Sequence, residues 1–222
     1  MASYEIEIKS LLGSRENAEL FAARMKELDP ALKKTGEGKQ LNHYFEGKGD
    51  WKAVAEAIPT LEDKQIFLEL TAKAKDFSLR TRSGDGKVLL VLKASIDDTT
   101  SANGTARREF DKEVRMPLGA LDEIILDAGF TYQAKWSRER EEYAFAGANV
   151  TIDKNAGYGY LAEFEIIEED PSKAEATKAK LRDLMKRAGL EELDQARLAR
   201  MFAYYNAHWS EYYGTEKIFV IE

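Results

Sequence analysis

The chain has 222 residues, of which 44% are hydrophobic and 33% are charged, and its net charge is −7 at neutral pH. This composition is typical of a globular protein with one large or two small domains, and the acidic balance argues against a nucleic-acid partner. Cysteine is absent and the histidines are His43 and His208, which excludes disulfides, thiolate metal sites and histidine-rich zinc sites.

The first third of the sequence predicts both strands and helices. In chain order these are a strand at 3–10, a helix at 14–28, a strand at 40–46, a short helix at 50–57 and a helix at 61–74. Ser14 and Asp50 are suitable N-cap residues, and Pro30 stops the first helix. The stretch IFLELT within the last helix could also form a strand.

The rest of the sequence predicts closely spaced strands with one helix among them, and then two C-terminal helices. The predicted strands are 77–82, 87–95, 105–114, 133–141, 141–147, 148–155, 160–167 and 216–222, and the predicted helices are 118–129, 172–189 and 190–209. The stretch SGDGK predicts a tight hairpin turn, and residues 96–105 predict a polar loop. Strands grouped at hairpin spacing favour an antiparallel sheet and an α+β fold.

The organisation of the sequence favours a single domain over residues 1–222, with C-terminal helices from about residue 171. There is no repeat at a fixed spacing and no flexible linker rich in serine or glycine. No apolar run approaches the roughly 18 residues that cross a bilayer, and the first residues do not resemble a signal peptide. We therefore expect a cytoplasmic protein with no membrane partner.

Most predicted strands carry charged side chains on one face. In YEIEIKS, three charges alternate with Ile6 and Ile8, and side chains on a strand alternate between its two faces. The helices at 14–28 and 118–128 carry apolar stripes that need a sheet to cover. Together these patterns predict a curved sheet with helices outside and a charged concave face. Closure of this sheet into a barrel would remove its exposed edge strands.

The expected concave face contains both signs of charge. Its basic residues are Lys9, Arg80, Arg82, Lys93, Arg107, Arg138 and Arg140. Its acidic residues are Glu5, Glu7, Glu109, Asp111, Glu113, Asp153, Glu163 and Glu165. One interpretation is a lattice of salt bridges, although desolvating so many ions is unfavourable unless their geometry is excellent.

The second interpretation is a binding site. The pairs Glu5 with Glu7 and Glu163 with Glu165 have no basic residue between them on the same face, so a cation is expected there. Oxygen ligands without cysteine or histidine favour Mg²⁺ or Mn²⁺. The paired arginines at 80 and 82 and at 138 and 140 suit forked hydrogen bonds to phosphate oxygens, so the face is suited to a chain of phosphates.

Several motifs occur in a fixed order along the chain. They are Glu5-x-Glu7-x-Lys9, LRTR at 79–82, a strand with Lys93, R-x-E-x-D-x-E at 107–113, R-x-R-x-x-Y at 138–143 and TIDKNAGYGYLAEFE at 151–165. Over about residues 4–166 this set resembles the CYTH superfamily, the triphosphate tunnel metalloenzymes. The resemblance implies an eight-stranded antiparallel β-barrel, or tunnel, with a charged lumen and helices packed outside.

The resemblance also implies roles for individual residues. It assigns the metal to Glu5, Glu7, Glu109, Asp111, Asp153, Glu163 and Glu165. It assigns the phosphates to Lys9, Arg80, Arg82, Lys93, Arg107, Arg138 and Arg140. Asp111 stands where the family more often has glutamate, which shortens the ligand arm, and Arg138 stands where lysine is common, which preserves the charge. The segment 47–75 looks longer than the usual connection, and 216–222 looks like an addition.

The leading functional prediction is a triphosphatase that requires Mg²⁺ or Mn²⁺ and hydrolyses inorganic triphosphate, thiamine triphosphate or a nucleotide. In it, Glu5 or Glu7 helps to hold a metal that activates water, and Lys9 or Lys93 assists as an acid. The alternatives are a class IV adenylyl cyclase, which forms cyclic AMP and pyrophosphate from ATP, and a non-catalytic polyphosphate or nucleotide sensor.

Some residues have a structural interpretation beside a functional one. Trp51, Trp136 and Tyr160 could stack on a base, but aromatic residues in a small barrel are more often part of the core. His43 and His208 are interpreted as structural or surface groups. The apolar stripe at 191–207 is interpreted as core packing, with a homodimer contact as the alternative.

Overall fold

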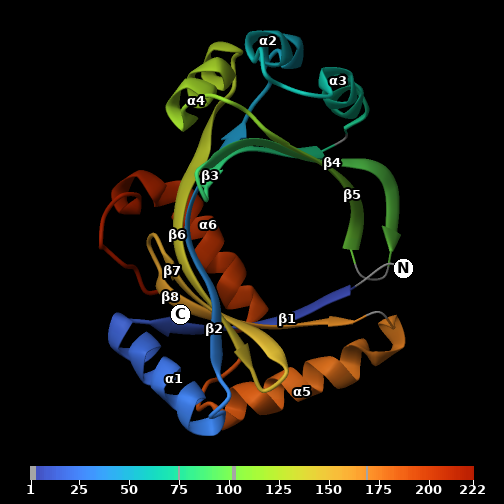
Figure 1. Ribbon diagram of the computed structural model, residues 1–222. Coiled ribbons are helices and arrows are strands. Elements are labelled where there is room, and N and C mark those ends of the chain that lie inside the picture. Colours follow the sequence, from blue (N-terminus) through green and yellow to red (C-terminus); the bar gives the residue numbers. More distant parts are fainter. Residues whose placement is uncertain (1–3, 75, 102–103, 169) are drawn as a thin grey trace. The chain divides into compact units, whose positions relative to one another are not determined.

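The computed structural model describes residues 4–74, 76–101, 104–168 and 170–222 (Figure 1). Within these ranges, the side chains of residues 4–5, 95–101, 104–109 and 171 are not described. The strands are β1 (Tyr4–Gly13), β2 (Lys33–Glu46), β3 (Asp76–Gly84), β4 (Lys87–Ser101), β5 (Gly104–Glu113), β6 (Thr131–Phe145), β7 (Ala148–Asn155) and β8 (Gly159–Glu168). The helices are α1 (Arg15–Leu28), α2 (Trp51–Ala57), α3 (Lys64–Lys73), α4 (Leu118–Asp127), α5 (Ala174–Arg187) and α6 (Gln195–Tyr212), with a 3₁₀ turn at Pro171–Lys173.

The eight strands form one sheet in the order β1-β8-β7-β6-β2-β3-β4-β5, and the described pairings between them are antiparallel. This confirms the predicted α+β class with eight antiparallel strands. The chain divides into two compact units, residues 1–39 with 137–222 (unit 1) and residues 40–136 (unit 2). The single domain over 1–222 stays a prediction.

In unit 1, helices α1 and α5 cover one face of the strands. Both helices contact β1 and β8, and Ile8 of β1 packs beside Phe164 of β8, Phe21 of α1 and Leu181 of α5. Burial of these apolar side chains is the main stabilising contribution to the unit. Because strand side chains alternate, Glu7 and Lys9 of β1 and Glu163 and Glu165 of β8 face away from these helices, as the alternation in YEIEIKS predicted.

In unit 2, helices α2, α3 and α4 supply the apolar cover of the strands. Val54 of α2, Phe67 of α3 and Ile125 of α4 are buried in one cluster with Leu79 of β3 and Leu92 of β4. The long segment 47–75 therefore forms two helices that complete this core. Ser14 and Asp50 are N-caps as predicted, since each side chain accepts hydrogen bonds from backbone N–H groups of its helix.

The structure also differs from the sequence prediction in two stretches of the sheet. Most of the region 96–105, predicted as a loop, is extended: β4 runs to Ser101 and β5 begins at Gly104, and threonine suits an extended chain. Residues 102–103 lie outside the described residues. The strands predicted at 133–141 and 141–147 are one continuous strand, since no turn residue separates them. The turn at Asp85 and Gly86 is confirmed, with positive φ at both residues.

The segment 216–222 is not a strand of the sheet, contrary to the prediction. A single parallel bridge joins Ile218 to Gly157, and the Phe219 N–H donates to the Gly157 carbonyl at 2.7 Å. The ring of Phe219 lies against the side chains of Tyr158, Tyr204, Tyr205 and Tyr212. The segment thus packs between α6 and the β7–β8 turn. It does not form a strand of the sheet, because a turn offers no strand edge for continuous backbone pairing.

Substituting Gly157 by alanine is expected to destabilise this contact. Gly157 has a φ of +85°, and a Cβ there would lie 2.5 Å from the Tyr205 ring and 2.9 Å from the Phe219 ring. We expect Gly157→Ala to lower the free energy of unfolding, measured by urea denaturation, by about 2–3 kcal/mol. Gly147→Ala is the matched control, because its φ is +81° and the nearest atom lies 3.9 Å away. Equal losses in the two variants would contradict the steric explanation.

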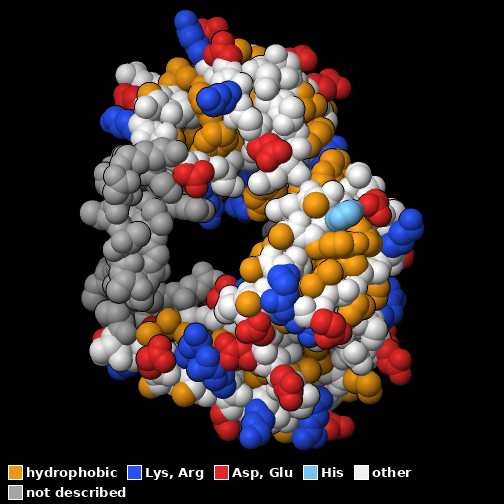
Figure 2. All heavy atoms as spheres, turned by 180° about the vertical axis from the view of Figure 1, so that it is seen from behind, with side chains coloured by type: hydrophobic (Ala, Val, Ile, Leu, Met, Phe, Trp, Pro, Cys, Tyr) orange, Lys and Arg blue, Asp and Glu red, His pale blue; other side chains and the backbone are white. Residues whose placement is uncertain are grey.

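The exterior carries acidic and basic side chains interspersed on the face shown in Figure 2. Within the part of the chain that the structure describes, no helix has both the length and the hydropathy to span a bilayer. On α6, Leu198, Met201 and Tyr205 are buried, which confirms core packing for this part of the stripe, while Phe202 is partly exposed. The homodimer contact stays a prediction.

Candidate functional site

One face of unit 1 gathers seven of the predicted charged residues. These are Glu7 and Lys9 of β1, Arg138 and Arg140 of β6, Asp153 of β7, and Glu163 and Glu165 of β8. Strand register brings them together, since the residues at 7 and 165, at 9 and 163, and at 140 and 153 stand directly opposite each other. This charged face lies opposite the strand face that α1 and α5 cover.

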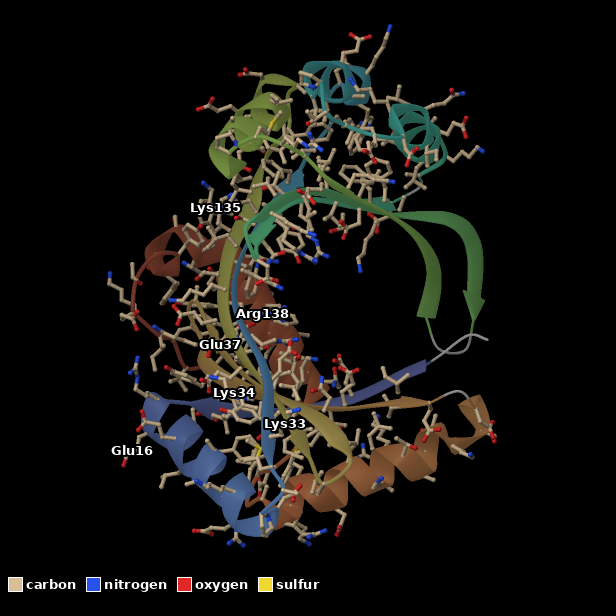
Figure 3. All side chains as sticks on the ribbon, viewed as in Figure 1. Glu16, Lys33, Lys34, Glu37, Lys135 and Arg138 are labelled. Carbon is tan, nitrogen blue, oxygen red and sulfur yellow. The ribbon has the colours of Figure 1, made fainter. Side chains whose placement is uncertain are left out.

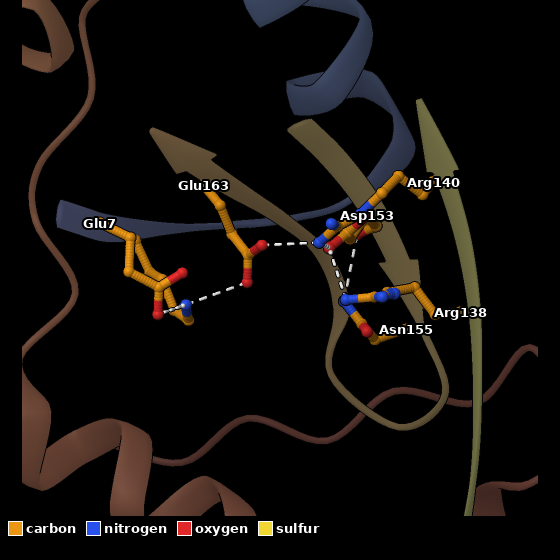
Figure 4. Close-up of polar contacts among 7 residues, drawn as sticks. Glu7, Arg138, Arg140, Asp153, Asn155 and Glu163 are labelled. Atoms are coloured by element: carbon orange, nitrogen blue, oxygen red, sulfur yellow. Dashed lines mark hydrogen bonds and ion pairs between the residues drawn. The ribbon is translucent and has the colours of Figure 1, made fainter. Parts of the chain in front are cut away.

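Lys9 lies between two of the carboxylates. Its Nζ is 2.6 Å from Glu7 Oε1 and 3.0 Å from Glu163 Oε1 (Figure 4). Burial lowers the pKa of Lys9, but Glu163 and Glu7 outweigh it and the pKa is raised. Cross-strand pairing therefore places a basic group between Glu7 and Glu163, which spacing along a single strand does not show. The cation expected at the pairs Glu5 with Glu7 and Glu163 with Glu165 stays a prediction.

Arg140 connects Asp153 with Glu163. Its Nε and Nη2 atoms donate to the two carboxylate oxygens of Asp153 at 2.7 and 2.5 Å, and Nη2 also donates to Glu163 Oε2 at 2.6 Å (Figure 4). The Asp153 side chain is only 2% exposed, and burial raises its pKa against the opposing effects of Arg140 and Arg138. Burial alone would raise the pKa of Glu163, but Lys9 and Arg140 hold it below its usual range.

In unit 2, Arg80, Arg82 and Lys93 lie on the strand face away from the core cluster. Arg80 Nη1 donates to the Tyr44 hydroxyl at 2.8 Å, and Arg82 Nε donates to Asn42 Oδ1 at 3.1 Å. Lys93 stands opposite Ser78 on the same face, because residues 78, 80 and 82 alternate with the buried residues 79 and 81. Asn42 and Tyr44 are not among the residues predicted from the sequence, although their spacing of two residues on a strand was a usable signal.

Several predicted residues are placed only in part. Glu5, Arg107 and Glu109 belong to described strands, but their side chains lie outside the described residues. Asp111 and Glu113 are exposed on β5, opposite Val91 and Leu89 of β4.

The two histidines have the structural and surface positions that the sequence predicted. His43 is buried, and its Nδ1 lies 2.6 Å from Asp122 Oδ2. His208 is more exposed and bonds to Glu211.

The donor set of unit 1 fits a hard divalent cation in its chemistry. Glu7, Asp153, Glu163 and Glu165 offer only oxygen atoms, and the buried Thr151 Oγ1 stands opposite Glu163 without a hydrogen-bond partner among the described residues. Among the described side chains, no three acidic or histidine groups are already gathered around one point. A cation bound there would therefore compete with Lys9 and Arg140 for the carboxylate oxygens.

A groove of about 570 Å³ in unit 1 lies between α1 and the helix-facing side of the strands. Lys34 and Glu37 of β2 (Figure 3) lie 2.6 Å apart at their charged atoms, and Lys34 also bonds to Glu141 at 2.7 Å. Glu37, Glu141, Ile152 and Tyr160 line the groove. Tyr160 therefore lies on the helix side of the strands, away from the charged face.

The CYTH domain model matches residues 3–199 of the sequence. The chain belongs to the CYTH domain family. This family comprises triphosphatases and adenylyl cyclases, which supports an enzyme that uses a triphosphate substrate and a divalent metal. The motifs that run from Glu5 to Glu165 in the sequence lie within the matched residues.

Solved structures show the same fold at low sequence identity. A protein from Pyrococcus horikoshii OT3 is 18% identical with a TM-score of 0.54, and covers 90% of this chain and 99% of its own. A candidate adenylate cyclase from Vibrio parahaemolyticus is 14% identical with a TM-score of 0.54, at 91% and 99% coverage. A conserved hypothetical protein from Pyrococcus furiosus is 20% identical with a TM-score of 0.53, at 85% and 92%. No curated protein matches the sequence.

Proposed function

We propose that this CYTH protein is a divalent-metal-dependent triphosphatase that hydrolyses inorganic triphosphate or an organic triphosphate such as thiamine triphosphate or a nucleotide. The observation that carries the proposal is the charged face of unit 1, where carboxylates and guanidinium groups occupy one face of adjoining strands. A triphosphate and its cation need both kinds of group at once.

The protein's own residues would mainly position the substrate and stabilise charge. Arg138 and Arg140 donate hydrogen bonds to phosphate oxygens, and the buried Asp153 keeps Arg140 in place. Mg²⁺ or Mn²⁺, held by Glu7, Glu163 and Glu165 together with Glu5, would neutralise phosphate charge and lower the pKa of a bound water.

Hydrolysis forms a bond from a water oxygen to the terminal phosphorus and breaks the bond to the bridging oxygen. The leaving group is the diphosphate, whose former bridging oxygen takes up a proton, while the attacking water releases one to solvent. Lys9 is the proposed proton donor in unit 1, where its ammonium already lies beside Glu7 and Glu163. Lys93 has the same proposed role in unit 2. The basic residues Arg80, Arg82 and Arg107 are proposed phosphate ligands, and Glu109 and Asp111 are proposed outer metal ligands.

An adenylyl cyclase is the second candidate, because the same ions serve attack at the α-phosphorus. Cyclisation also needs a base pocket. Trp51 packs against Phe67, Phe77 and Phe130, so it belongs to the core of unit 2, and Tyr160 lines the groove beside α1. These positions remove two of the three proposed stacking residues and favour hydrolysis.

The deciding experiment incubates the purified protein with inorganic triphosphate, thiamine triphosphate or ATP in the presence of Mg²⁺ or Mn²⁺. Phosphate, pyrophosphate and cyclic AMP are followed together, with a chelator as the control. Phosphate release that stops with the chelator supports the triphosphatase. Cyclic AMP with pyrophosphate identifies a cyclase, and binding without turnover identifies a sensor; either result overturns the proposal.

Replacing Arg80 by alanine is expected to weaken binding of every triphosphate by about 10- to 100-fold, whatever its organic group, because a phosphate ligand is lost. Dissociation constants for inorganic triphosphate, thiamine triphosphate and ATP would be measured by calorimetry. Lys87→Ala is the matched control, since Lys87 is an exposed residue in the same unit whose described partner is Glu113. A loss confined to one substrate would instead assign Arg80 to the organic part.

A further inference from the structure

Three consecutive cross-strand pairs join β2 to β3 in unit 2. Asn42 stands opposite Arg82, His43 opposite Thr81, and Tyr44 opposite Arg80. Because side chains alternate along each strand, the first and third pairs share the face that carries Lys93, while the middle pair faces the core. The arginine pair is therefore supported from both sides of one short stretch of sheet.

On the charged side, each arginine is held by the residue directly opposite it. The Tyr44 hydroxyl accepts from Arg80 Nη1 at 2.8 Å, and the Arg80 guanidinium carbon lies 5.6 Å from the centre of the Tyr44 ring. Asn42 Oδ1 accepts from Arg82 Nε at 3.1 Å. Tyr44 and Asn42 are neutral acceptors, so these two contacts orient the guanidinium groups without adding an opposite charge. The described acceptors of Arg140 are carboxylates.

On the core side, Asp122 of α4 fixes the middle pair. Its carboxylate accepts from Thr81 Oγ1 at 2.7 Å and from the Tyr132 hydroxyl at 2.8 Å, and it lies 2.6 Å from His43 Nδ1. Asp122, Thr81 and His43 are each at most 6% exposed. This network fixes β2 and β3 in the register that places Tyr44 and Asn42 opposite their arginines.

We propose that Tyr44 and Asn42 are positioning residues that hold Arg80 and Arg82 as a pre-arranged pair of guanidinium groups for the oxygens of a triphosphate. The inference deepens the proposed function and rests on it. An arginine side chain has many rotamers, and ordering it on binding weakens affinity. Two residues that order the arginines beforehand, through neutral oxygens, strengthen binding without competing for charge.

The test measures the affinity of the imido analogue of inorganic triphosphate, which resists hydrolysis, by calorimetry with Mg²⁺. We expect Tyr44→Phe and Asn42→Ala each to weaken binding by about 3- to 10-fold, and to raise KM for triphosphate while kcat changes less than about twofold. Tyr143→Phe is the matched control, because the Tyr143 hydroxyl donates to Glu141, away from the charged faces, and its affinity should stay unchanged. Thermal melting confirms that each variant is folded.

A double-mutant cycle separates positioning from a general structural effect. If Tyr44 acts through Arg80, Tyr44→Phe should weaken binding in the wild-type background and have no further effect in an Arg80→Ala background. Equal effects in both backgrounds, or no effect in either, would overturn the inference. If Arg80→Ala itself leaves affinity unchanged, the phosphate role of Arg80 in the proposed function fails instead. Normal affinity in Tyr44→Phe beside a weakened Arg80→Ala refutes the positioning role alone.

Discussion

Replacing Arg140 by alanine is expected to lower the free energy of unfolding by about 3–5 kcal/mol, because it leaves the buried Asp153 carboxylate without its two closest donors. Glu163 loses one of its two described cationic partners in the same variant. Urea denaturation followed by circular dichroism measures the loss. This is one of the two largest stability effects that we expect from single substitutions.

Two further variants test the cause of this loss. Arg140→Lys retains the charge but not the forked pair of hydrogen bonds, so we expect an intermediate loss. In Arg140→Ala combined with Asp153→Ala, the uncompensated buried charge is gone, and part of the stability should return. The explanation fails if the single alanine variant is as stable as the wild type, or if the double variant loses the sum of the two single losses.

Replacing Asp122 by alanine is expected to destabilise unit 2 by about 3–4 kcal/mol. The Asp122 carboxylate accepts hydrogen bonds from Thr81 and Tyr132 and is the partner of His43. Its removal takes this hydrogen-bond partner away from three polar groups of the core. Asp122→Asn retains the shape and one acceptor oxygen, so its loss should be smaller. Chemical denaturation of the three proteins at pH 7 provides the comparison, and a neutral Asp122→Ala would contradict the structural role.

The pH dependence of stability gives an independent test of the same network. Burial raises the pKa of Asp122, but the hydrogen bonds from His43, Thr81 and Tyr132 outweigh it and the folded-state pKa is lowered. A carboxylate with a lowered pKa contributes stability above its unfolded value of about 3.9 and loses it as pH falls through the folded value. The stabilities of wild type and Asp122→Asn should therefore converge in acid. A difference that stays constant from pH 7 to acid would contradict this.

The positions of the strand faces could be predicted from the sequence because side chains alternate with a period of two. The alternation of Ile8 with Glu7 and Lys9 is enough to distinguish the helix-covered face of β1 from its charged face. The structure confirms that Ile8 is buried. The ends of elements were less predictable. Threonines between Ser95 and Ser101 suit both a loop and an extended strand, and pairing with β5 decides between them.

The contacts within the site could not be predicted in the same way, because they depend on register between strands that are far apart in sequence. Lys9 meets Glu163 only through the β1–β8 pairing, which the spacing of residues along one strand does not show. Tyr44 and Arg80 are likewise joined by register alone. The motifs identified the types of group that are present, and the structure shows which of the described groups touch.

The most direct measurement compares two variants in which a positively charged side chain is replaced by a neutral one, on opposite faces of β6 and β7. Arg138→Gln changes the charged face, and Lys154→Gln changes the helix-facing side beside Glu216. Both remove one positive charge. We predict that Arg138→Gln raises the dissociation constant for Mg²⁺-triphosphate at least tenfold, while Lys154→Gln changes it less than twofold. Equal changes in the two variants, or a larger change in Lys154→Gln, would show that triphosphate does not bind to the charged face.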